Sequence, residues 1–154
     1  MPDVCDNGDE LGGDFMESTV DNTIRHVLKS MRHIRKGDIS SAILVILIEL
    51  GFCPQSDGFG HLRKAIYQKF HDPDQRFVEL YESVGKMYTP EVGSFQVEQA
   101  IRSAISAAWE SGSRENWACF FPKDRDGNWK KPSNGEFISR LACMLELWSS
   151  CREE

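Results

Sequence analysis

The stretch from residue 94 to residue 110, SFQVEQAIRSAISAAWE, constrains the fold more than any other part of the chain. Its apolar residues recur at steps of three, four and one, which places them on one face of an α-helix. They are Val97, Ala100, Ile101, Ala104, Ile105, Ala108 and Trp109. The other face carries Gln96, Gln99, Arg102, Ser103 and Ser106, which are side chains that can bind a base edge or a phosphate. The pattern predicts a helix whose apolar face packs on a core and whose polar face is exposed and available to bind a ligand.

Five other stretches show helical spacing. They are residues 22–37, 38–50, 61–70, 77–88 and a last helix that Ser133-x-x-Glu136 opens as a capping box. Asp38 is the expected N-cap of 38–50, and apolar residues all round predict that this helix is central and covered on all sides. Asp72 and Pro73 predict an N-cap and first-turn proline ahead of 77–88. The fold class is therefore all-α, with about six helices.

Between the fifth and sixth of these helices the periodicity is lost. Asp126-Gly127 is a hairpin-turn signal, and Lys123, Arg125, Lys130 and Lys131 lie around it. We interpret this segment as a short hairpin or an extended loop. A helix-turn-helix pattern is formed by helix 77–88, the turn from Thr89 to Gly93 and helix 94–110. Any pair of antiparallel helices also matches this pattern.

Charge divides the chain into three parts. Residues 1–21 hold seven of the 24 acidic residues and no Lys or Arg, which predicts a disordered acidic tail. Such a tail either competes with DNA for a basic face or only aids solubility. Residues 22–37 are expected to form a basic amphipathic helix that carries Arg25, Lys29, Arg32 and Arg35. It lies along phosphates, binds an acidic partner, touches a membrane surface or only packs with a solvated basic face. Residues 38–150 form the domain proper, and the chain from residue 22 onward, with 18 basic and 17 acidic residues, is close to neutral.

The remaining signals exclude several classes of protein. The five cysteines have no CxxC spacing and no signal peptide precedes them, so we expect reduced thiols and a cytoplasmic protein. The longest apolar run, from Ala42 to Ile48, is far shorter than the roughly 20 residues that span a membrane. Asp124-x-Asp126-x-Asn128 lacks the Gly and the Glu that a calcium loop requires later. His26 and His33 have no Cys or carboxylate nearby to complete a zinc site. No nucleophile or nucleotide motif occurs, so we expect no enzyme, cofactor or metal.

Three motifs in order resemble the C-terminal DNA-binding effector domain of the sporulation initiation response regulator. They are Gly58-x-x-x-Leu62-Arg63-x-Ala65-Ile66, Val97-Glu98-x-Ala100-Ile101-Arg102-x-Ala104-Ile105-x-x-Ala108-Trp109 and Lys131-Pro132-Ser133-Asn134-x-Glu136-Phe137-Ile138. The resemblance covers roughly residues 38–147. It implies a six-helix domain with a helix-turn-helix that binds a short DNA box through the major groove, with tandem dimers formed through the last helices.

Some positions depart from that family. Gln96 and Gln99 stand where Arg is usual, and Ser103 stands where His is usual, whereas Glu98 and Arg102 are retained. Because Arg favours guanine and Gln favours adenine, we expect a changed target sequence. The segment ahead of the resemblance is too short for a receiver domain, so we expect no control by aspartyl phosphorylation of a receiver in this chain.

The first hypothesis is a sequence-specific transcription regulator that binds double-stranded DNA, with a second copy and RNA polymerase as further partners. The expected base-reading residues are Gln96, Gln99, Arg102, Ser103 and Glu98. The expected phosphate contacts are Ser94, Lys86, Lys123, Arg125, Lys130 and Lys131, with Arg25, Lys29, Arg32 and Arg35 as an auxiliary arm. Glu98 either accepts from a cytosine amino group or pairs with Arg102. The alternative is a protein-interaction module of the same fold that never touches DNA.

Overall fold

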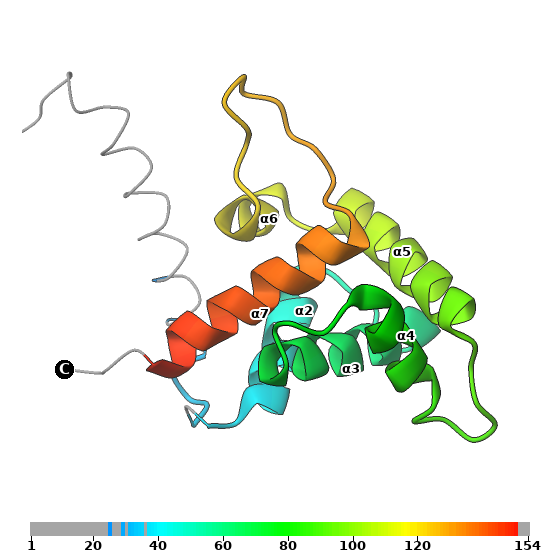
Figure 1. Ribbon diagram of the computed structural model, residues 1–154. Coiled ribbons are helices and arrows are strands. Elements are labelled where there is room, and N and C mark those ends of the chain that lie inside the picture. The colour runs from blue at the N-terminus through cyan, green and yellow to red at the C-terminus, as the bar shows by residue number, and fades with distance from the viewer. Residues whose placement is uncertain (1–24, 26–28, 30, 36, 151–154) are drawn as a thin grey trace, which may run out of the picture.

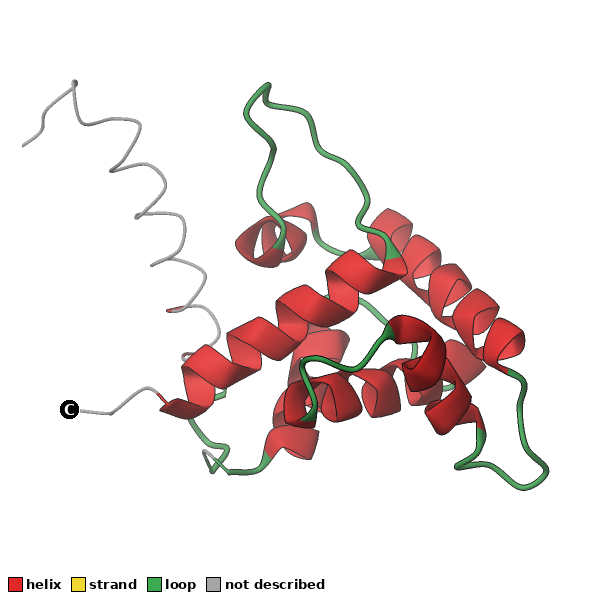
Figure 2. Cartoon of the chain, in the orientation of Figure 1, coloured by secondary structure: helices red, strands yellow, loops and turns green. Residues whose placement is uncertain are grey.

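The computed structural model describes residues 25, 29, 31–35 and 37–150, and Figures 1 and 2 show that this part of the chain is helical with no strand. Its labelled helices are α2 (Ile39–Glu49), α3 (Asp57–His71), α4 (Phe77–Gly85), α5 (Ser94–Ser111), α6 (Arg114–Phe120) and α7 (Asn134–Ser150). The predicted all-α class is confirmed. The acidic tail 1–21 lies outside the described residues, as does much of the basic segment 22–37, in which Arg25 and Lys29 are helical.

Helix α3, rather than α2, is the central helix of the domain, because α2, α4, α5 and α7 all pack against it. The expected N-cap of α2 is present, because Asp38 Oδ1 accepts from the Ser41 amide at 3.1 Å. The chain leaves the helix at Gly51 with a φ of +93°. The expectation that α2 is covered on all sides is wrong. Ile48 is 47% exposed, because no described helix covers that side of α2.

Helix α3 begins at Asp57, four residues before the predicted start at His61. Ser56 caps it by accepting from the Phe59 amide at 3.2 Å. The predicted start is late because glycines disfavour helix interiors, and Gly58 and Gly60 both lie in the first turn of α3. Gly58 instead lets α3 approach α5 closely, since a Cβ at this position would overlap the carbonyl oxygen of Ala100.

Helices α4 and α5 form the predicted helix-turn-helix, but the connection between them is longer than predicted. Helix α4 ends at Gly85, and residues 86–93 lead to α5. The segment folds back on Gly85, and the Val92 amide donates to the Gly85 carbonyl at 3.0 Å. A Cβ at residue 85 would overlap the Val92 carbonyl oxygen, so only glycine fits there. The predicted N-cap at Asp72 is also wrong, because α4 begins only at Phe77 after a turn.

Helix α6 was not predicted. It exists because Trp117 is buried between α2 and α5, where its indole N–H donates to the carbonyls of Leu50 at 2.9 Å and Ala108 at 3.2 Å. Residues 121–133 then form an extended loop, so the hairpin alternative is wrong and the loop alternative is confirmed. The Asp126-Gly127 turn is present, with a φ of +81° at Gly127.

Helix α7 starts with the predicted capping box and closes the core. The Glu136 amide donates to Ser133 Oγ at 3.2 Å, and the Ser133 amide donates to Glu136 Oε1 at 2.9 Å. The inner face of α7 is buried by Phe137, Ile138, Leu141, Leu145 and Trp148. No described helix is long and apolar enough to cross a membrane.

Candidate nucleic-acid interface

Helix α5 buries the face that the sequence predicted and exposes the opposite one. Val97, Ile101, Ala104, Ile105 and Ala108 are buried. Of the expected base-reading residues, Gln96, Arg102 and Ser103 are exposed, and Gln99 and Glu98 are half-buried. The structure therefore brings all five onto one helix, with the exposed side chains facing away from the core.

The side chains of Glu98 and Arg102 form a salt bridge, with 3.0 Å between Glu98 Oε2 and an Arg102 guanidinium nitrogen. The interpretation of Glu98 as the i+4 partner of Arg102 is confirmed. The Arg102 side chain remains 54% exposed and that of Glu98 36% exposed. An exposed pair of this spacing contributes only about 0.3–0.5 kcal/mol. Releasing Arg102 to another acceptor therefore costs little.

Gln96 has a structural role at the start of the same helix. Its Oε1 accepts from the Gly93 amide at 3.1 Å, which satisfies a backbone donor just ahead of the first turn. Ser94 is the first residue of α5 and is half-buried, and Lys86 is exposed directly after α4. Ser94 and Gln96 therefore lie in the first turn of α5, where backbone amides favour an anion, and Lys86 lies at the start of the connection that leads to it.

The loop 121–133 brings its basic residues to the other end of α5. Lys131 Nζ donates to Ser106 Oγ at 2.7 Å. The Trp129 ring meets the Trp109 ring edge-on with 5.5 Å between centroids, and the Arg114 guanidinium lies 5.1 Å from the Trp129 ring centroid. Lys123, Arg125 and Lys130 are exposed on this loop. Four of the expected phosphate contacts therefore lie on a segment that is anchored to α5.

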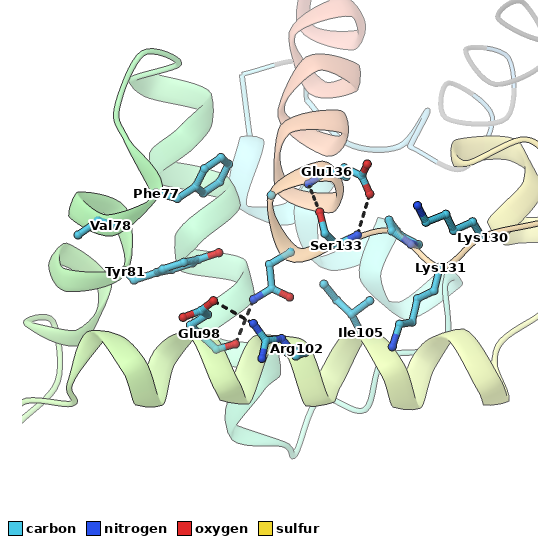
Figure 3. Close-up of a pocket in the computed structure, with 13 residues that line it drawn as sticks. Phe77, Val78, Tyr81, Glu98, Arg102, Ile105, Lys130, Lys131, Ser133 and Glu136 are labelled. Carbon is cyan, nitrogen blue, oxygen red and sulfur yellow. Dashed lines mark hydrogen bonds and ion pairs between the residues drawn. The ribbon is translucent and has the colours of Figure 1, made fainter. Parts of the chain in front are cut away.

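A groove of about 600 Å³ separates the side of α5 from α4 and the start of α7 (Figure 3). Its walls are Phe77, Val78, Tyr81, Glu98, Arg102, Ile105 and residues 130–136. Asn134 links α7 to α5 across the groove by donating through Nδ2 to the Glu98 carbonyl at 3.0 Å. The Ser133 amide lowers the pKa of Glu136, and burial raises the pKa of Tyr81. The walls of this groove therefore carry the basic side chains of Arg102, Lys130 and Lys131 together with the carboxylates of Glu98 and Glu136.

The basic residues ahead of α2 do not join this surface. Arg25, Lys29, Arg32 and Arg35 are exposed. Figure 1 shows the blue segment that precedes α2 at the opposite side of the molecule from α5. Met31 in this segment is fully buried in the core. The structure therefore does not bring the expected auxiliary arm together with the base-reading residues.

Sequence reasoning missed two features of this surface. Phe95, the second residue of α5, is 68% exposed, and the signal was its position outside the apolar spacing of the helix. The packing of Arg114 and Trp129 on Trp109 was also missed, because the three residues lie in separate segments with no shared pattern.

Asp124 belongs to the segment that begins like a calcium loop. Its Oδ1 accepts from the amides of Asp126 and Asn128, so this carboxylate caps a turn of the loop.

The family model described as "Sporulation initiation factor Spo0A C terminal" matches residues 43–145, from within α2 to within α7. The chain belongs to this family. The resemblance that three short motifs suggested is thereby confirmed. The Spo0A C-terminal family consists of DNA-binding transcription-regulator domains of sporulation, and it is not a family of enzymes.

Proposed function

We propose that this protein is a sequence-specific transcription regulator that reads the DNA major groove with α5. The observation that carries the proposal is the arrangement of Gln99, Arg102 and Ser103 on the exposed face of the second helix of a helix-turn-helix. A recognition helix of this kind enters the major groove with its N-terminal half against the bases. Arg suits guanine and Gln suits adenine, so these residues can discriminate base pairs.

Phosphate contacts come from both ends of α5. Ser94 begins α5, Lys86 begins the connection that leads to it, and Lys123, Arg125, Lys130 and Lys131 lie on the anchored loop. Contacts of this type position a protein on the duplex without reading sequence. Residues 38–150 hold 12 Lys and Arg against 15 Asp and Glu, so affinity for phosphates depends on this local cluster rather than on net charge. The proposed DNA-binding unit is therefore residues 38–150.

The proposal is tested by selecting duplexes from a random DNA pool and measuring affinity for the selected and a scrambled duplex. We expect the selected duplex to bind at least about 10³-fold more tightly at physiological salt. Both affinities should fall steeply as salt rises, because phosphate contacts release counterions. Equal affinities for the two duplexes would contradict base reading by α5.

Two observations favour a second candidate, a protein-interaction module that keeps the fold and does not bind DNA. Gln96 is engaged in capping, and the Arg102 charge is paired with Glu98. Fewer groups are therefore free for bases than the sequence suggests. The same titrations decide between the two candidates. Absence of binding to any duplex at low salt, where the phosphate term is largest, favours the interaction module.

A second copy of the chain is the proposed partner on DNA, with α7 as the contact. Leu147 on this helix is 43% exposed, and Cys143 and Glu146 beside it are exposed as well. RNA polymerase is the further proposed partner, because a regulator that activates transcription acts by contacting it. Analytical ultracentrifugation with duplexes that carry one or two copies of the selected site tests the dimer. Independent occupancy of the two sites would contradict it.

A further inference from the structure

Phe95 presents an aromatic ring to solvent on the face of α5 that otherwise carries polar side chains. Its exposed fraction of 68% is the largest among the exposed large apolar residues of the described chain, ahead of Val78 at 65%. Single exposed apolar residues are common and need no function by themselves. The position of Phe95 is what distinguishes it.

Phe95 is the second residue of α5, four residues before Gln99 and seven before Arg102. Residues at these spacings lie above one another on the same helix face. Residues near the N-terminus of a recognition helix are those that reach the base edges. The Phe95 ring therefore belongs to the same row as two of the proposed base-reading side chains.

The chemistry of the ring limits what it can recognise. A phenyl group neither donates nor accepts a hydrogen bond, so it cannot pair with the polar edge of a base. In the major groove the apolar group on a base edge is the C5-methyl of thymine. Placing the ring against that methyl removes two apolar surfaces from water at once.

We propose that Phe95 reads a thymine methyl group and is a specificity-determining residue of the DNA site. This inference rests on the proposed function, because it requires α5 to lie in the major groove. It predicts that the target contains at least one thymine whose methyl group, rather than its hydrogen-bonding edge, is recognised.

The test combines a change in the protein with a change in the DNA. Each thymine of the selected duplex is replaced in turn by deoxyuridine, which removes only the methyl group. Binding is measured with the unmodified protein, with Phe95→Ala and with Ile48→Ala, which removes an exposed apolar side chain from α2. Thermal unfolding checks that both variants remain folded, as expected for exposed positions.

We expect one replacement to weaken binding of the unmodified protein about fourfold, which corresponds to ~0.8 kcal/mol for one buried methyl group. The same replacement should have almost no effect on Phe95→Ala and its full effect on Ile48→Ala. Sequence-specific binding in which every replacement acts equally on all three proteins would overturn the inference and leave the proposed function standing. A selected site without thymine would do the same. Failure to select any duplex would overturn both.

Discussion

The Trp129 ring meets the Trp109 ring edge-on at 5.5 Å between centroids, and this contact holds the basic loop 121–133 against helix α5. Arg114 covers both rings, at 5.7 Å from the Trp109 centroid and 5.1 Å from the Trp129 centroid. Edge-to-face pairs and cation–π contacts each add about 0.5–1.5 kcal/mol beyond burial. The loop cations are therefore positioned by packing as well as by the Lys131–Ser106 hydrogen bond.

Replacing Trp129 with Ala should weaken DNA binding without changing the preferred sequence. The loop cations would lose their fixed position, and each lost phosphate contact lowers the slope of log affinity against log salt by about 0.9. Salt titrations on the selected duplex measure the slope. Trp129→Phe is the matched control, because the Trp129 indole N–H has no hydrogen-bond partner among the described residues. An unchanged slope in Trp129→Ala would show that the anchored loop does not touch phosphates.

Two glycines of α3 should respond differently to the same substitution. A Cβ at Gly58 would overlap the Ala100 carbonyl, whereas the nearest atom to a Cβ at Gly60 is Tyr88 Oη at 3.4 Å. Gly58→Ala should lower the free energy of unfolding by about 1–3 kcal/mol through overpacking. Gly60→Ala should leave it unchanged or raise it by up to ~1 kcal/mol, since Ala suits a helix better.

Chemical denaturation of both glycine variants measures these free energies. Equal effects of the two substitutions would contradict the close approach of α3 and α5 at Gly58. The close approach at Gly58 fixes the position of α5 on α3, so Gly58→Ala should also weaken binding to the selected duplex.

His61 should make the protein less stable in mild acid. Its side chain is 6% exposed and its Nδ1 lies 2.9 Å from Tyr88 Oη. Burial lowers the pKa of His61 from its ordinary 6.5, with Asp57 raising it and Lys64 lowering it to a smaller extent. The unfolded chain therefore binds a proton near pH 6.5 that the folded chain does not yet bind. The contribution of neutral His61 to the free energy of unfolding is fully present above pH 6.5. It falls as the pH drops toward the lower pKa of His61 in the folded chain.

Denaturation of the unmodified protein and of His61→Gln between pH 8 and pH 5 measures this effect. The free energy of unfolding should decline with falling pH more steeply for the unmodified protein than for the variant. Parallel pH profiles would show that His61 is not the group responsible. The comparison uses slopes, so a general loss of stability in the variant does not affect it.

The sequence predicted the helices whose signals are local. Residues 94–110 keep an apolar face and a polar face over several helical turns, with no helix-breaking residue. The observed helix α5 has almost the same bounds as this prediction. The capping box at Ser133 predicted the start of α7 for the same reason. Glu98 and Arg102 lie one helical turn apart, so their salt bridge was also among the expected alternatives.

The features that failed depend on partners far along the chain. The start of α3 at Asp57 was not predicted, because the contact of Gly58 with Ala100 cannot be seen from neighbouring residues. Helix α6 was missed because Trp117 is held by the Leu50 carbonyl, 67 residues away. The anchoring of Trp129 on Trp109 depends on the same kind of contact between distant segments.

The most direct test of the account compares Arg102→Ala with Lys130→Ala in selections from a random DNA pool. If α5 reads bases, Arg102→Ala should lose the preference at one base pair and about 1–3 kcal/mol of affinity for the selected site. Lys130→Ala should instead keep every base preference and weaken all duplexes by a similar factor. If Arg102→Ala keeps every preference and loses affinity equally for selected and random duplexes, α5 does not read the bases and the central claim is wrong.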